Sequence, residues 1–157
     1  MSFEKAKSHL EKCGFGDRVI EFDVSSATVE LAAKALGCDG AHIAKTLSFA
    51  IGEEKSVLIV TAGDTKVNNG KFKSFFGVKA KMLSFDEVEE KIGHAVGGVC
   101  PFGVNEGVVI YLDESMKRFD TIYPACGSSN SAVKLSTDEL EKCCDFKAWV
   151  DVVTIME

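Results

Sequence analysis

Two apolar segments joined by a short polar turn constrain the fold of this chain more than any other feature. Residues 41–51 (AHIAKTLSFAI) and 57–63 (VLIVTAG) have the length and the apolar, β-branched content of strands. The turn between them, IGEEKS, is short enough for the two strands to pair as an antiparallel hairpin. We therefore expect this hairpin to lie within a sheet, with the other elements arranged around it.

Helix and strand signals are interspersed along the rest of the chain. Two segments, Ser84–Glu87 and Ser136–Glu139, match the capping box S-x-x-E that begins helices. Helices are expected over residues 2–13, 29–36 with Ser26 as the cap, 72–76, 85–92 and 137–143. Further strands are expected over residues 19–24, 80–84, 107–115, 119–125, 132–135 and 149–153. Because several strands are joined by short turns, a fully parallel sheet is excluded. The prediction is one α+β domain over residues 1–157, with a mixed, largely antiparallel sheet surrounded by helices.

Composition limits the classes of function. The 157 residues suit one domain, and a hydrophobic content of 46% supports a packed core. The net charge of −6 argues against a general binder of phosphate backbones, since such proteins are normally basic. The N-terminus has no apolar segment of signal-peptide type, and no apolar run approaches the ~20 residues needed to span a bilayer, so a cytosolic location is expected.

Five lysines without an acid among them form a local exception to the acidic charge. This set, called the lysine patch below, comprises Lys66, Lys71, Lys73, Lys79 and Lys81. It is interpreted either as a solvated face or as a landing surface for phosphates.

The cysteines give no local sign of a metal site or a catalytic thiol. The six cysteines are Cys13, Cys38, Cys100, Cys126, Cys143 and Cys144. They form no C-x-x-C pair and have no histidine at ligand spacing, so we expect free thiols and no metal. The pairs Cys100 with His94 and Cys126 with His42 are open as nucleophile and base only if the fold brings them together. No phosphate-binding, G-x-S-x-G or H-E-x-x-H motif is present, and no cofactor is expected.

Lys45 is the first candidate for chemistry. In a strand over residues 43–50 it shares a face with Ile43, Leu47 and Phe49. A lysine in such surroundings extends to solvent, pairs with an acid or opens onto a pocket. The pattern is compatible with a structural lysine at the edge of the core and with a cation aimed into a cleft. Asp64, in the following turn, either caps that turn or orients a partner.

Two loops are further candidates for a binding site. Five glycines lie in the segment from Gly93 to Gly107, both ends included, and they allow backbone amides to approach a ligand closely. The segment CGSSNS (126–131) has small polar residues typical of a turn, and these also suit the wall of a ligand pocket.

The order of these segments resembles that of the YbaK family of prolyl-tRNA synthetase-associated editing domains. The resemblance rests on IEFDVSSATVELAAKALGC, HIAKTLSF, VLIVTAGDTKVN, GGVCPFG and CGSSNSAVKLSTDEL, and covers roughly residues 19–140. The lysine of I-A-K-T-L and the G-G-x-x-P-F-G loop are its most specific parts.

The resemblance implies a function and a set of site residues. It implies hydrolysis, in trans, of the ester between tRNA and a small wrong amino acid such as Ala, Cys, Ser or Thr. It implies that Lys45 is the essential residue. The partners that it implies are the acceptor end of tRNA and a synthetase such as prolyl-tRNA synthetase. The substrate-binding residues that it implies are Gly97, Gly98, Pro101, Phe102, Gly103, Gly127, Ser128 and Asn130. A non-catalytic module that binds tRNA or a synthetase, and a thiol hydrolase that uses Cys100, are the alternatives.

Overall fold

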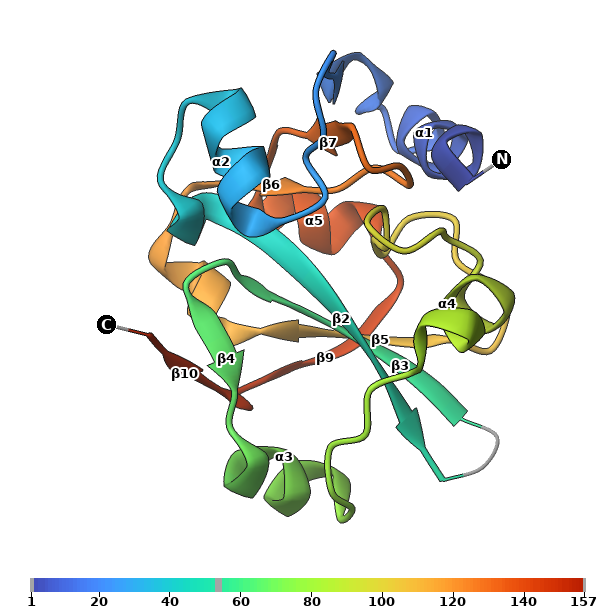
Figure 1. Cartoon of the computed structure of the whole chain (residues 1–157), viewed down its shortest axis with the longest axis vertical. Coiled ribbons are helices and arrows are strands. Elements are labelled where there is room, and N and C mark those ends of the chain that lie inside the picture. The colour runs from blue at the N-terminus through green and yellow to red at the C-terminus, as the bar shows by residue number, and fades with distance from the viewer. Residues whose placement is uncertain (1, 53–54, 157) are drawn as a thin grey trace.

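The central hairpin is present in the computed structural model, which describes residues 2–52 and 55–156. Strand β2 (Ile43–Ile51) pairs antiparallel with β3 (Lys55–Ala62), and Lys45 lies opposite Thr61. Within the described residues these strands belong to a six-stranded sheet of order β8-β6-β2-β3-β5-β9 (Figure 1). The other strands of this sheet are β5 (Val109–Asp113), β6 (Thr121–Pro124), β8 (Leu135–Ser136) and β9 (Phe146–Val150).

The sheet is mixed, as predicted. Besides β2–β3, the pair β6–β8 is antiparallel, whereas β2–β6, β3–β5 and β5–β9 are parallel. Two small antiparallel sheets join β1 (Val19–Glu21) to β7 (Ser131–Val133) and β4 (Thr65–Val67) to β10 (Val153–Ile155). Four of these seven strand pairs in the described chain are antiparallel, and the three parallel pairs all lie in the central sheet.

Helices form in each region where the sequence predicts one. They are α1 (Ser2–Lys12), α2 (Val29–Leu36), α3 (Asn69–Phe76), α4 (Phe85–Ile92) and α5 (Thr137–Cys143), with short 3-10 turns at Gly16–Arg18, Gly40–His42 and Glu114–Arg118. Both predicted capping boxes are confirmed, at Ser84 with Glu87 and at Ser136 with Glu139.

Several predicted details are wrong, among them the strand at residues 132–135, which is two strands, β7 and β8, in different sheets. The cap of α2 is Thr28 rather than Ser26, because the Thr28 hydroxyl accepts the Leu31 amide while the Ser26 amide donates to the Ser129 carbonyl. Residues 80–84 make only one isolated bridge, Phe49 to Met82, instead of a strand. The single strand predicted at 149–153 is two strands, β9 and β10, separated by residues 151–152.

Alternate residues of β3 bury their side chains on opposite faces of the sheet. Leu58, Val60 and Ala62 pack in a cluster with residues of α1, α4 and α5. Val57 and Ile59 pack on the other face with Phe72 of α3. Figure 1 shows α3 below the sheet, opposite α1. In the part of the chain that the structure describes, no helix is long and apolar enough to cross a membrane.

An ion pair ties α5 to the N-terminal part of the chain and makes stability depend on pH. Arg18 donates two 2.8 Å hydrogen bonds to the carboxylate of Glu139. This interaction, with the Ser136 amide, lowers the Glu139 pKa from 4.5 to about 2. Because the folded pKa is depressed, the stabilisation is present above pH 4.5 and is lost as the pH falls toward 2.

We expect Glu139→Gln to flatten this acid dependence. The melting temperature of the wild type should fall more steeply between pH 4.5 and 2 than that of the variant, as followed by circular dichroism. Glu106→Gln, at an exposed loop position, is the control and should behave as the wild type. Equal slopes for wild type and Glu139→Gln would show that the pair does not contribute.

Candidate functional site

A cavity of about 500 Å³ lies along a free edge of β2. Residues 43–44 of β2 pair with β6, and residues 48–50 pair with residues 81–83 through the bonds Leu83 N–H to Ser48 and Ala50 N–H to Lys81. Between these pairings, residues 45–47 have no strand partner on that side among the described residues. The cavity is lined by β2 itself and by residues that include Thr28, Val29, Leu83, Val88, Gly97, Val99, Tyr123 and Ser131. Its volume lies in the range of small-molecule sites.

Lys45 is a half-buried cation at this cavity. Its side-chain amine donates to the backbone carbonyl of Thr65, which begins β4. Burial lowers the pKa of Lys45, while the negative charges of Asp64 and Glu30 act in the opposite direction. The strand pattern left open both a structural lysine and a cation aimed into a cleft; the structure places Lys45 in the cavity lining and adds the acids that favour its charged form.

Asp64 is held in place by a second ion pair. Arg118 donates to both of its carboxylate oxygens, at 3.0 and 2.6 Å. This interaction is the main reason that the pKa of Asp64 lies below its ordinary value, and the charge of Lys45 contributes in the same direction. Asp64 therefore remains ionised near neutral pH. Of the two roles considered from the sequence, orientation of a charged partner is the one that this geometry supports.

Hydroxyl groups of β2 and β7 line the cavity; Ser131 belongs to the predicted CGSSNS turn, whereas Thr46 and Ser48 were not singled out in the sequence. Thr46, Ser48 and Ser131 all border it. The Thr46 Oγ1 atom is buried and, in the described structure, has no hydrogen-bond partner. A buried hydroxyl without a partner is costly unless a ligand or water satisfies it. The available signal was the alternation of Thr46 and Ser48 along an otherwise apolar strand.

The glycine-rich loop contributes less of the cavity wall than the resemblance implies. Gly97 borders the cavity, but Gly98, Pro101, Phe102 and Gly103 do not. Pro101 and Phe102 are buried, and the Phe102 ring lies 5.9 Å from that of His9 on α1. A Cβ atom at Gly98 would lie 2.3 Å from the Ser128 amide nitrogen, so this glycine allows two loops to pack together.

The second predicted turn, residues 126–131, reaches the cavity only at Ser131 and otherwise holds a neighbouring segment in place. Gly127, Ser128 and Asn130 are absent from the cavity lining, whereas Ala125, Ser131 and Ala132 belong to it. The Asn130 side-chain amide donates to the Phe22 carbonyl at 3.0 Å, and the Phe22 amide donates to the Asn130 carbonyl at 2.8 Å. The turn thus fixes the segment that leads into α2.

The cysteine–histidine pairs are unsuited to nucleophilic catalysis. Cys100 Sγ lies 3.5 Å from His94 Nε2, but both residues are fully buried and neither lines the cavity. His94 Nε2 lies 2.6 Å from the Phe102 carbonyl, to which it donates its proton, so it cannot also accept the proton of Cys100. Burial raises the pKa of the Cys100 thiol and raises that of Cys126 to about 12. His42 is bonded to the Thr121 carbonyl at 3.0 Å.

We expect Cys100→Ser to retain the activity proposed below. A serine at this position keeps a donor for the Phe102 carbonyl, and hydrolysis rates should stay within about threefold of the wild type, whereas loss of a covalent nucleophile costs many orders of magnitude. The rate of ester loss under single-turnover conditions is the measurement. If the Cys100→Ser protein is folded but inactive, the alternative hypothesis of a thiol hydrolase that uses Cys100 is supported instead.

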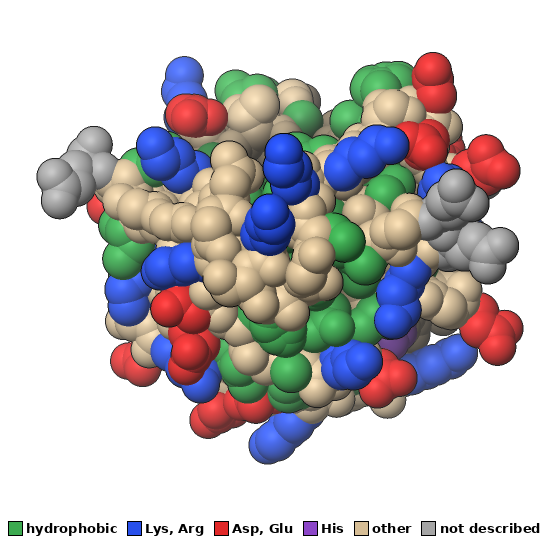
Figure 2. Space-filling model, turned by 90° about the horizontal axis from the view of Figure 1, so that it is seen from below, with side chains coloured by type: hydrophobic (Ala, Val, Ile, Leu, Met, Phe, Trp, Pro, Cys, Tyr) green, Lys and Arg blue, Asp and Glu red, His purple; other side chains and the backbone are tan. Residues whose placement is uncertain are grey.

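The lysine patch lies on the surface, partly on α3. All five of its side chains are exposed, and Lys71 pairs with Asp151 at 3.0 Å. Figure 2, which views the molecule from below Figure 1, shows Lys and Arg side chains spread over this face and acids mainly around its edge. Lys79 and Lys81 lie in the segment that leads to Met82, a residue of the cavity wall.

Known proteins resemble this chain in sequence and in fold. The profile of the aminoacyl-tRNA editing domain matches residues 24–143. An uncharacterized protein of Bacillus subtilis (strain 168), YwhH, is 47% identical over 97% of each chain. The proline–tRNA ligase of Bacillus cytotoxicus is 26% identical over 92% of this chain, which spans 23% of that enzyme. A crystal structure described as a candidate trans-editing enzyme for prolyl-tRNA synthetase superimposes with a TM-score of 0.86 at 29% identity, over 98% of this chain and 97% of the other.

Proposed function

Because the chain belongs to the aminoacyl-tRNA editing domain family, we propose that it hydrolyses, in trans, the ester of tRNAs charged with a small wrong amino acid. The observation that carries this proposal is the half-buried Lys45 at the cavity along β2, where the Thr46 hydroxyl has no hydrogen-bond partner among the residues that the structure describes. A cation at such a cavity can hold a phosphate or an ester oxygen. The volume of about 500 Å³ admits a small aminoacyl group together with part of the terminal adenosine.

The proposed reaction needs positioning rather than a covalent intermediate. An aminoacyl ester is already activated, so orientation and stabilisation of the developing oxyanion supply much of the rate. Lys45 binds the terminal phosphate or the ester oxygen, and the wall at Gly97 and Val99 faces the aminoacyl carbonyl. Water adds to the carbonyl carbon, the ester C–O bond breaks, and the ribose hydroxyl leaves with a proton. The products are the free amino acid and uncharged tRNA.

The other predicted loop residues have an indirect role in this proposal. Gly98, Pro101, Phe102 and Gly103 hold the first loop against α1 and against the turn at Ser128. Gly127 and Asn130 hold the second turn. The rigid wall that results keeps Gly97 at the rim of the cavity.

The partner proposed is the acceptor end of tRNA, and the proline-specific tRNA carrying a wrong amino acid is the first to test. The similarity to proline–tRNA ligases and to the candidate trans-editing enzyme supports this choice. A panel of tRNAs mischarged with Ala, Cys, Ser or Thr, scored for ester loss, tests the function and identifies the amino acid. Hydrolysis of at least one mischarged tRNA well above the uncatalysed rate is expected. Tight binding of uncharged tRNA without hydrolysis of any member of the panel would instead indicate a binding module.

Charge reversal at the lysine patch should weaken tRNA binding. We expect Lys79→Glu with Lys81→Glu to raise Kd and to reduce the slope of log K against log[salt] by about 1 to 2, because each phosphate contact contributes roughly 0.7–0.9. Lys142→Glu with Lys147→Glu changes the net charge equally at exposed positions of α5 and β9 and serves as the control. Equal salt slopes for the two double variants would remove the patch from the tRNA-binding surface.

A further inference from the structure

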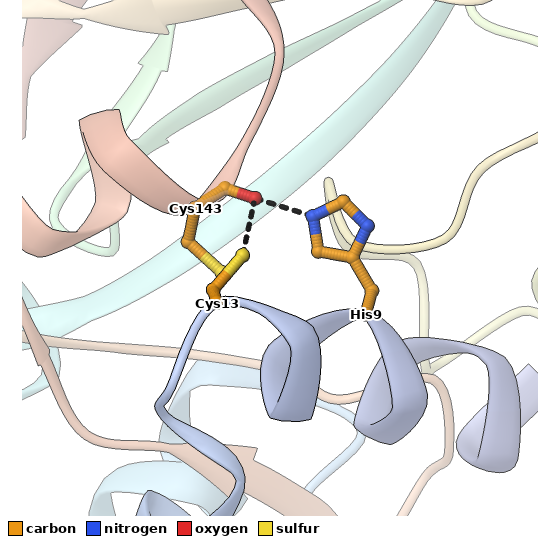
Figure 3. Close-up of side chains that lie close together, drawn as sticks. All are labelled: His9, Cys13 and Cys143. Carbon is orange, nitrogen blue, oxygen red and sulfur yellow. Dashed lines mark hydrogen bonds between the residues drawn. The ribbon is translucent and has the colours of Figure 1, made fainter.

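One histidine and two cysteines converge where the ends of α1 and α5 meet, outside the cavity. His9 lies in the last turn of α1, Cys13 directly follows that helix, and Cys143 is the last residue of α5. The ligand atoms of the three side chains all lie within 4.8 Å of one another. Figure 3 shows the three side chains directed toward one another. None of them borders the cavity beside Lys45.

From this geometry we propose that His9, Cys13 and Cys143 bind a thiophilic divalent cation, with Zn²⁺ as the chemical type. Zinc binds thiolate at about 2.3 Å and imidazole at about 2.0 Å in tetrahedral arrangement, which separates neighbouring ligand atoms by roughly 3.5–3.8 Å. Small side-chain rotations bring the three ligand atoms from within 4.8 Å to this spacing. Three protein ligands leave the fourth position to water.

Existing contacts already orient the ligands. The Cys143 backbone carbonyl is bonded to His9 Nε2 and accepts the Cys13 thiol at 3.6 Å. The dashed lines in Figure 3 mark both contacts, which hold the imidazole and the Cys13 thiol beside Cys143. His9 and Cys13 are half-buried, so a cation can reach the cluster from solvent. Cys143 is buried, so water is excluded from that side of the site.

The charges balance when both thiols lose their protons. Zn²⁺ displaces one proton from Cys13 and one from Cys143, two protons pass to solvent, and two thiolates neutralise the dication. Burial raises the pKa of the Cys143 thiol, so this proton stays in place until a cation displaces it. To bind the ion through Nε2, His9 gives up its hydrogen bond to the Cys143 carbonyl and carries its proton on Nδ1, so the ring stays neutral.

The ion would connect two distant parts of the chain. Cys13 and Cys143 are 130 positions apart, and α1 is otherwise anchored by the buried side chains of Ala6 and Leu10. Since only the folded chain brings the ligands together, metal binding must stabilise the fold. At a free Zn²⁺ concentration 100-fold above Kd, the melting temperature should rise by about 5–10 °C.

The test uses purified full-length protein, reduced with a phosphine and freed of metal. We expect it to bind one equivalent of Zn²⁺ by equilibrium dialysis, and Co²⁺ to produce the charge-transfer absorption of a cobalt–thiolate site. Cys13→Ser and His9→Gln should each lower the affinity at least 10-fold. His9→Gln keeps a donor for the Cys143 carbonyl, so circular dichroism and the metal-free melting temperature should stay near those of the wild type.

Cys38→Ser is the matched control, because Cys38 is also half-buried but lies after α2, outside the cluster. It should bind Zn²⁺ as the wild type does and show the same thermal shift. The proposal is overturned if the wild type binds no stoichiometric Zn²⁺. It is also overturned if folded Cys13→Ser and His9→Gln proteins bind the ion as tightly as the wild type. Neither result depends on whether the protein hydrolyses aminoacyl-tRNA.

Discussion

Lys45→Ala should lower kcat/KM for deacylation of a mischarged tRNA by about 100- to 1,000-fold, the loss typical of removing one group that stabilises an oxyanion. The variant loses the cation at the free edge of β2, which Asp64 and Glu30 help to keep charged. Initial rates of ester loss at subsaturating substrate provide the measurement. The proposed reaction has no covalent intermediate, so a residual rate should remain.

Lys45→Met separates the charge from the hydrocarbon stem. Methionine retains most of the apolar length of lysine, so the fold and the packing beside Leu47 should be preserved. We expect Lys45→Met to be as inactive as Lys45→Ala, and Lys147→Ala, an exposed position on β9, to be fully active. If Lys45→Met retained the wild-type rate, the charge would have no catalytic role, and Lys45 would be the structural lysine that the strand pattern also allowed.

Gly127→Ala should destabilise the protein by about 2–4 kcal/mol, the sum of left-handed backbone strain and forced movement of a packed neighbour. Gly127 has φ +79°, and a Cβ atom there would lie 2.3 Å from the Ser2 carbonyl oxygen in the backbone of α1. For a chain of this length the melting temperature should fall by roughly 5–15 °C. Thermal unfolding by circular dichroism is the measurement.

Gly77→Ala isolates the conformational part of this effect. Gly77 has φ +77° at the end of α3, and a Cβ atom there would meet nothing within 4 Å. Its cost should be limited to backbone strain of about 1 kcal/mol. Equal losses of stability in the two variants would show that the contact between the 126–131 turn and α1 is looser than the structure indicates.

The local parts of the fold were predictable because their signals are local. Each capping box lies within four residues, and the β2–β3 hairpin needs only two apolar segments and a turn. The parallel pairs β3–β5 and β5–β9 join segments far apart in sequence. Local turn signals therefore do not predict which residues of these strands lie opposite one another. The same limit explains the single strand predicted at residues 149–153, where β9 and β10 pair with different sheets.

The candidate site, like the fold, was predictable only where its sequence signals are local. Alternation placed Lys45 on an unusual strand face, and the structure sets it beside a cavity. The cavity itself depends on where β6 and residues 81–83 stop pairing with β2, which one sequence does not reveal. The family resemblance implied Pro101 and Phe102 as pocket residues, yet both are buried and neither belongs to the cavity lining. The cluster of His9, Cys13 and Cys143 was also missed: His9 and Cys13 are one helical turn apart, but Cys143 lies 130 positions after Cys13 and joins them only in the fold.

The most direct test of the central proposal compares wild type and Lys45→Met on one substrate, the mischarged tRNA that the wild type hydrolyses fastest in the panel. Catalytic amounts of each protein are added, and the first-order rate of ester loss is measured against the rate without protein. The proposal predicts multiple turnovers by the wild type and a rate at least 100-fold lower for Lys45→Met. A wild-type rate equal to the uncatalysed rate on every mischarged tRNA would contradict it.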